Sequence, residues 1–237
     1  MPNHPITSEF IQYLITSSQE GKSDHLPSLL EISQELDVSV ARLREQLEVA
    51  RALGMVEVRP HTGIRQLPYN FYPAVRQSLS YCLALEQNRF KAYADLRRNI
   101  EASFWEQAVR QLTEVDRAHL KDLVASAWEK LRGIPIHIPH AEHRELHLAI
   151  YRRLDNPFVI GLLEAYWDAY ENFRLNLYAD YTYLEQVWTY HQRMVDAICA
   201  GDYQAGYQAL IEHTELIRYR VDPVSNDNKE TIASLKE

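Results

Sequence analysis

Apolar residues recur every three or four positions along most of the chain, a spacing that predicts amphipathic helices. Near the N-terminus three such helices are followed by two short segments in which apolar and polar residues alternate, as in strands. The predicted helices cover residues 6–18, 28–36 and 40–53, and the predicted strands cover residues 55–59 and 64–67. Three helices followed by a hairpin describe a winged helix-turn-helix.

Beyond residue 68 the helical spacing continues almost without interruption. Short segments containing Gly, Pro or Asn separate the helices, and the polar residues from 223 onward show no periodicity. We therefore expect a mostly α protein with three parts: a winged helix-turn-helix at 1–68, an antiparallel bundle of about six or seven helices at 69–222, and a flexible tail at 223–237. The helices expected in the bundle cover residues 71–85, 87–112, 114–131, 141–154, 157–178, 184–200 and 203–219.

Composition indicates the cellular compartment of the protein and the classes of partner that it favours. The chain has 237 residues, a formal net charge of −8 and two cysteines. Two cysteines give no disulfide framework, which fits a reducing compartment, and no signal peptide or transmembrane run is visible. We expect a cytoplasmic protein without a membrane partner. The acidic total does not favour nucleic acid, although local charge placement decides such binding.

Four histidines stand out by their positions within the predicted helices. His143 and His147 are one turn apart and share a helical face, while His191 and His213 lie on apolar faces of two later helices. A single histidine on an apolar face is usually a hydrogen-bonded core residue. Four of them on inward faces of three helices indicate a shared ligand, and neutral imidazole is the commonest metal ligand in proteins.

Residues 26–63 resemble, without a gap, the N-terminal domain of GntR-family transcription regulators. The matching segments are Leu26-Pro27-Ser28, Val38-Ser39, Leu43-Arg44-Glu45, Leu53 to Arg59, and Gly63. The resemblance implies that the third helix reads the major groove of operator DNA and that the wing lies at the minor groove. The DNA-binding residues expected on this basis are Ser39, Arg44, Arg59, Thr62, Gly63 and Arg65.

Two positions depart from the pattern of that family. Val40 stands where the family usually has arginine, and Thr62 stands where a basic residue is usual in the wing. The role of Arg42, which has no counterpart in the family, stays open. These departures leave a second hypothesis, in which the winged helix serves protein interaction.

The later helices resemble the effector-binding (FCD-type) domain of the FadR branch of the same family. The resemblance rests on Leu96 to Glu101, on His143 and His147 followed by Asn156-Pro157, and on His191, Gly201-Asp202 and His213. In metal-binding members the ligands are one aspartate and three histidines. By position these are His143, His147, His191 and His213, with His143 in place of the aspartate. An all-histidine set suits a divalent transition metal such as zinc or nickel.

Arg97 has two possible roles. It could bind the carboxylate of an effector, for which a planar guanidinium is suited, or it could pair with Glu101 one helical turn later. Together the two resemblances imply a homodimeric, ligand-responsive repressor that binds operator DNA. Four neutral histidines would leave the charge of the metal uncompensated, which favours a small organic acid as the effector.

An enzyme is the competing class of protein. The segment from His143 to His147 matches neither of the histidine–glutamate motifs of metalloproteases. The chain also lacks a nucleophile motif, a phosphate-binding loop and a dinucleotide fingerprint. We therefore expect a regulator rather than an enzyme. The alternative is a helical metalloprotein, either enzyme or scaffold, with the winged helix used for protein interaction.

Overall fold

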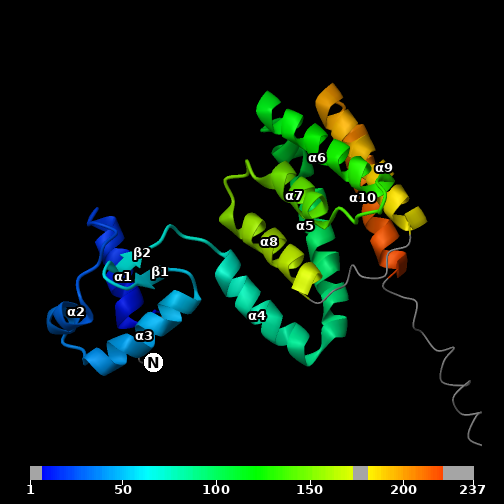
Figure 1. Ribbon diagram of the computed structural model, residues 1–237. Helices are drawn as coiled ribbons and strands as arrows, with labels where there is room; N and C mark the ends of the chain where they lie inside the picture. Colours follow the sequence, from blue (N-terminus) through cyan, green and yellow to red (C-terminus); the bar gives the residue numbers. More distant parts are fainter. Residues whose placement is uncertain (1–6, 173–180, 221–237) are drawn as a thin grey trace, which may run out of the picture. The chain divides into compact units, whose positions relative to one another are not determined.

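The computed structural model describes residues 7–172 and 181–220, and the predicted tail at 223–237 lies outside them. Within the described residues the chain is mostly helical and contains one β-hairpin (Figure 1). The elements are α1 (Glu9–Gln19), α2 (Leu29–Leu36), α3 (Val40–Ala52), β1 (Val56–Arg59), β2 (Gly63–Gln66), α4 (Tyr72–Leu85), the 3-10 helix η1 (Gln87–Arg89), α5 (Phe90–Arg110), α6 (Glu114–Arg132), α7 (His140–Tyr151), α8 (Pro157–Asn172), α9 (Tyr181–Ala200) and α10 (Tyr203–Arg220). The predicted fold class, a winged helix-turn-helix followed by a helical domain, is confirmed.

Local side-chain bonds fix where the first helices begin. Ser28 and Glu31 form a reciprocal capping box at the start of α2, in which each side chain bonds the backbone N–H of the other. Ser39 caps α3, because its Oγ accepts a hydrogen bond from the backbone N–H of Arg42. The short turn between α2 and α3 runs from Asp37, the C-cap of α2 with a left-handed backbone, to Ser39, the N-cap of α3.

We expect Ser39→Ala to cost about 1 kcal/mol of stability, because it removes the acceptor for one N–H at the start of α3. Urea unfolding followed by circular dichroism would measure this loss. Ser39→Asp is the matched control, since aspartate also caps helices and should retain stability. Equal stability of the alanine variant and the wild type would contradict the capping role.

The winged helix encloses a small apolar core of its own. Buried residues from all three helices and both strands contribute to it: Phe10, Tyr13, Leu14, Ile32, Leu43, Leu47, Ala50, Val56 and Ile64. The two strands pair antiparallel, with Val56 opposite Gln66 and Arg59 opposite Gly63. Gly63 has a φ of +76°, a conformation that glycine adopts without strain, so the turn of the wing closes at this residue.

Two compact units divide the described chain. The first extends to Ala84 and includes Pro157–Ala165, the first half of α8; the second includes Leu85–Asn156 and continues from Tyr166. The predicted boundary at residue 68 stays a prediction. In the second unit α9 packs against α6 and α10, and α5 packs against α7 and α10. These contacts bring the inner faces of α5, α7, α9 and α10 towards one another.

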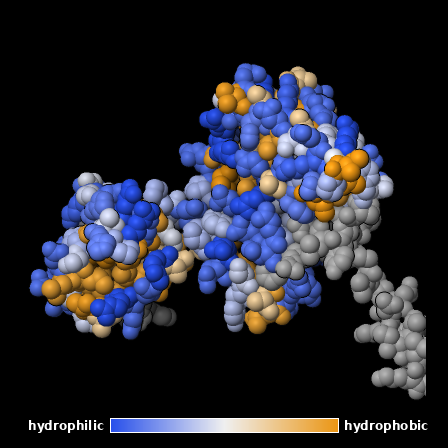
Figure 2. All heavy atoms as spheres, in the orientation of Figure 1, coloured by the Kyte–Doolittle hydropathy of each residue, from blue (hydrophilic) through white to orange (hydrophobic). Residues whose placement is uncertain are grey.

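The visible surface is mainly hydrophilic, with apolar side chains gathered in a few places (Figure 2). This distribution follows from the amphipathic spacing of the helices, which places most of the large apolar side chains in the core. Among the described residues, no helix has the length and apolar character needed to cross a membrane.

Candidate metal centre and nucleic-acid interface

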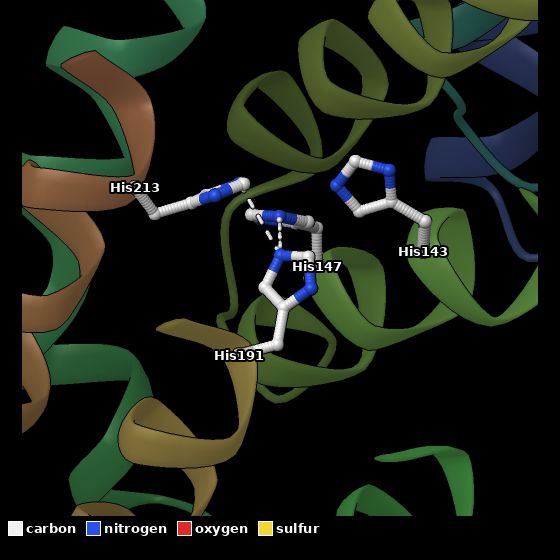
Figure 3. Close-up of side chains that lie close together, drawn as sticks. All are labelled: His143, His147, His191 and His213. Atoms are coloured by element: carbon white, nitrogen blue, oxygen red, sulfur yellow. Dashed lines mark hydrogen bonds between the residues drawn. The ribbon is translucent and has the colours of Figure 1, made fainter. Parts of the chain in front are cut away.

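The structure brings the four predicted histidines together from three helices. His143 and His147 come from α7, His191 from α9 and His213 from α10, and their rings form one cluster (Figure 3). Each ring offers one nitrogen to a group whose members all lie within 4.8 Å of one another. The i, i+4 spacing on α7 and the packing of α9 against α10 account for this convergence.

The spacing of the nitrogens fits a small metal ion. The Nε2 atom of His191 lies 3.2 Å from the Nε2 atoms of both His147 and His213. Zinc–nitrogen bonds of about 2.0–2.1 Å in a tetrahedron place neighbouring nitrogens about 3.3 Å apart. The Nε2 atom of His143 is buried and has no hydrogen-bond partner among the described residues. The cluster could therefore hold a metal.

Burial favours the neutral form of the four imidazole rings, which is the form that binds metals. His147, His191 and His213 are fully buried, and burial is the largest cause that lowers the pKa of each well below its usual value. Burial and the neighbouring rings lower the pKa of His143 in the same way. Neutral imidazole has a free lone pair for a metal, whereas imidazolium has none.

Aromatic side chains enclose the cluster. Trp167 packs edge-on against His143 with ring centroids 4.7 Å apart, and Trp188 packs in the same way against His191, also at 4.7 Å. Both indoles are buried. They limit the access of water to the rings and hold the imidazole planes in place.

Arg97 lies beside the histidines and is itself buried. Its Nε is 2.9 Å from Oε2 of Glu101, so the predicted pairing between these residues is confirmed as an ion pair, although its angle does not suit a hydrogen bond. The guanidinium also stacks on the rings of Tyr166 and Trp167, at 4.6 and 5.0 Å. Its Nη2 lies 2.9 Å from Nδ1 of His147.

The sequence did not single out Trp167 as a neighbour of the site. Tyr166 was visible as part of an apolar helical stripe, which favours core packing and also allows a ligand pocket. Glu101 was visible only as a possible partner of Arg97. Its contact with Nδ1 of His147, at 3.1 Å, depends on the packing of α5 against α7 and has no local signal in the sequence.

The arginines predicted to bind DNA differ in whether their side chains already form ion pairs within the protein. Arg44 is exposed on α3 and has no ion-pair partner among the described residues. Arg59 pairs with Glu57 at 2.8 Å, and Arg65 pairs with Asp24 at 2.7 Å. The wing arginines would have to exchange these carboxylates for phosphates when DNA binds.

The other predicted DNA-binding positions lie at the expected places. Thr62 is exposed in the turn between the strands, next to Gly63, and Ser39 begins α3. Arg42 pairs with Glu9 of α1 at 2.5 Å, and Gln46 bonds the same carboxylate. This pairing gives Arg42 a role in joining α3 to α1.

Comparison with known proteins identifies the second unit. The FCD domain family matches residues 93–216, just over half of the chain. The chain is 25% identical over 193 residues to the HTH-type transcriptional regulator YieP of Escherichia coli, covering 78% of this chain and 80% of that protein. It is 24% identical over 221 residues to the Uxu operon transcriptional regulator of Escherichia coli, covering 91% and 85%. It is 22% identical over 209 residues to the HTH-type transcriptional regulator LutR of Bacillus subtilis, covering 84% and 92%.

A solved structure agrees at the level of the fold. The Streptococcus agalactiae GntR protein superposes with a TM-score of 0.66 at 16% identity, covering 89% of this chain and 97% of that one. The relatives are named as transcription regulators, which confirms the expectation that the chain is not an enzyme. The chain thus belongs to the GntR family of DNA-binding transcription regulators, in the branch whose effector domain is an FCD domain.

Proposed function

We propose that this protein is a homodimeric, cytoplasmic repressor that senses a small organic acid at a zinc or nickel centre. The observation that carries the proposal is the convergence of four histidine nitrogens within 4.8 Å inside the FCD domain. The winged helix of the same chain supplies the means of binding operator DNA. Metal and acid would then control one output, the affinity for the operator.

In this proposal α3 enters the major groove and the wing lies at the minor groove. Arg44 reads a base edge or a phosphate, since it is exposed and free of ion pairs among the described residues. Ser39 and Thr62 contact phosphates, Gly63 shapes the wing, and Arg59 and Arg65 supply its positive charge. One winged helix covers one half-site, so two copies of the chain are needed for a near-palindromic operator.

His147, His191 and His213 would bind the metal through Nε2, with His143 as the fourth ligand. Four neutral imidazoles favour zinc or nickel over the hard cations, which prefer oxygen. When bound, such an ion supplies positive charge for an anionic oxygen of the effector. Arg97 would pair with an oxygen of the same acid, as its fork of N–H donors allows.

The acid can change operator affinity only as far as it prefers one arrangement of the dimer over another. Its binding between α7, α9 and α10 would alter the packing of these helices. We propose that the spacing of the two copies of α3 changes as a result. A spacing that no longer matches the half-sites releases the operator.

Two measurements on the purified protein test this function together. Native mass spectrometry gives the subunit number and the metal content, and fluorescence anisotropy with a selected operator fragment gives DNA affinity with and without small carboxylic acids. We expect a dimer with one zinc or nickel per subunit, and an acid that weakens operator binding. A protein without operator affinity overturns the regulator role, and one that takes up neither zinc nor nickel overturns the metal centre.

The substitution His143→Asp tests the fourth ligand. We expect it to retain one metal per subunit, because carboxylate oxygen also binds zinc and aspartate is the usual residue of the family at this position. His143→Ala should lose at least the roughly 10–100-fold in zinc affinity that removing a hydrogen-bond partner of a ligand costs, which a competition assay with a chromophoric chelator measures. Zinc affinity that is unchanged in His143→Ala would remove this residue from the ligand set.

A further inference from the structure

The first turn of α3 presents apolar side chains at the surface of the winged helix. Ser39 caps the helix, so Val40 and Ala41 are its first two residues. Ala41 is exposed, and Val40 is partly exposed and lies outside the apolar core of the winged helix. Arg44 follows about one turn later and is a helical neighbour of both. These three side chains can therefore reach the same partner molecule.

The remaining sides of α3 are less suited to reading bases. One side is buried in the core and consists of Leu43, Leu47 and Ala50. Arg42 and Gln46 both bond the carboxylate of Glu9 on α1, which holds their side of the helix against the protein. The later turns carry the exposed carboxylates of Glu45 and Glu48, which repel phosphates. The first turn is thus the part of α3 best placed to approach base edges, as is usual for a recognition helix.

Most positive charges of the winged helix are already matched by carboxylates. Five of the six lysine and arginine residues in the first 67 positions form ion pairs within the protein: Lys22, Arg42, Arg51, Arg59 and Arg65. Non-specific affinity for DNA comes from cations that neutralise phosphates, and paired cations must first leave their carboxylates. Contacts with base edges therefore have to supply a larger share of the operator affinity.

The side chains of the first turn favour one base over the others. Val40 and Ala41 carry methyl groups and can neither donate nor accept a hydrogen bond. Thymine is the base that presents a methyl group in the major groove, at C5, and apolar side chains contact it there. The other three bases present hydrogen-bonding groups, which an apolar contact would leave unpaired. Arg44, in contrast, offers N–H donors that fit O6 and N7 of guanine.

We propose that Val40 and Ala41 recognise a thymine through its C5-methyl group, next to a guanine that Arg44 reads. Val40 lies one helical turn before Arg44, which is about 6 Å along the helix axis. Base pairs are stacked about 3.4 Å apart, so the two bases lie within about two base pairs of each other. The inference rests on the proposed insertion of α3 into the major groove and adds the base that its first turn selects.

Uracil gives the first test, because it differs from thymine only in lacking the methyl group. An operator is selected from random DNA with the wild-type protein, and each thymine of one half-site is then replaced in turn by uracil. We expect one such replacement, near a guanine, to weaken wild-type binding about fourfold, the value of one buried methyl group. Fluorescence anisotropy measures the affinities. Unchanged affinity at every position overturns the inference.

The substitution Val40→Ala assigns the methyl contact to this side chain. It should weaken binding to the thymine operator and lose most of the response to uracil. Alanine is a better helix former than valine, so the variant should retain its fold. Val49→Ala is the matched control, because Val49 is 53% exposed on α3 but faces the opposite direction, about two and a half turns later. It should respond to uracil as the wild type does. An equal response in the two variants overturns the role of Val40.

A change of base preference gives the second test. Arginine in place of Val40 would offer donors for guanine and no methyl contact, so Val40→Arg should prefer G·C to T·A at the position that responds to uracil. A second selection with this variant reports its preferred bases, and a preference that stays at T·A contradicts the contact. A wild type that selects no operator overturns the proposed function and this inference together. An operator that requires Arg44 but does not respond to uracil overturns this inference alone.

Discussion

Replacing His191 with alanine should abolish the thermal stabilisation that zinc gives to the protein. His191 is the central ring of the cluster, because its Nε2 lies 3.2 Å from those of both His147 and His213. A ligand present at about 100 times its dissociation constant stabilises the folded state by about 2.7 kcal/mol. For a chain of this length this corresponds to a rise in melting temperature of about 5–11 °C.

The comparison is made within each variant, with zinc and with a chelator, because the substitution also changes the metal-free core. His119→Ala is the matched control: this histidine is partly exposed and bonds Glu145 outside the cluster. It should retain the full zinc-dependent rise. A rise of equal size in His191→Ala would show that zinc binds elsewhere.

Operator binding should weaken by about 1–3 kcal/mol when Arg44 is replaced by alanine, roughly a 5–150-fold loss. The expectation follows from the freedom of this side chain, which is exposed on α3 and has no ion-pair partner among the described residues. Fluorescence anisotropy with operator and scrambled DNA measures the change. If Arg44 reads a base, the alanine variant should lose more affinity for the operator than for scrambled DNA.

Arg51 provides the control on the same helix. It lies in the last turn of α3, is exposed, and pairs with Glu48 at 2.6 Å. Arg51→Ala should leave operator affinity within about twofold, as for a surface substitution outside the interface. If Arg44→Ala behaves like Arg51→Ala, α3 does not read DNA through Arg44.

Helical periodicity predicted the order of the elements well, because most helices here are amphipathic and end at Gly, Pro or polar turns. The ends were less predictable. The helix expected from residue 87 begins at Phe90 after the 3-10 helix η1, since Glu86 has an extended φ of −142°. The predicted helix at 157–178 is described to Asn172, and its remainder lies outside the described residues.

The histidine cluster could be predicted because each member lies on an apolar helical face. The side chains that surround the cluster could not be predicted, because their contacts depend on how the separate helices pack against one another. Glu101 reaches His147 only through the packing of α5 against α7. The ion pair of Arg65 with Asp24 likewise joins residues that are far apart in the sequence and meet only through the fold. Neither relation has a local pattern in the sequence.

The edge-on contacts of Trp167 and Trp188 with the histidines should make tryptophan fluorescence sensitive to a metal bound in the cluster. Each indole lies against a ring of the cluster, with centroids 4.7 Å apart. Zinc has a filled d shell and does not absorb the emission of tryptophan, whereas nickel and copper have partly filled d shells that accept the excitation energy at such short range. We therefore expect intrinsic fluorescence to distinguish these metals in the unlabelled protein: nickel or copper(II) bound to the histidines should quench the two indoles, and zinc should not.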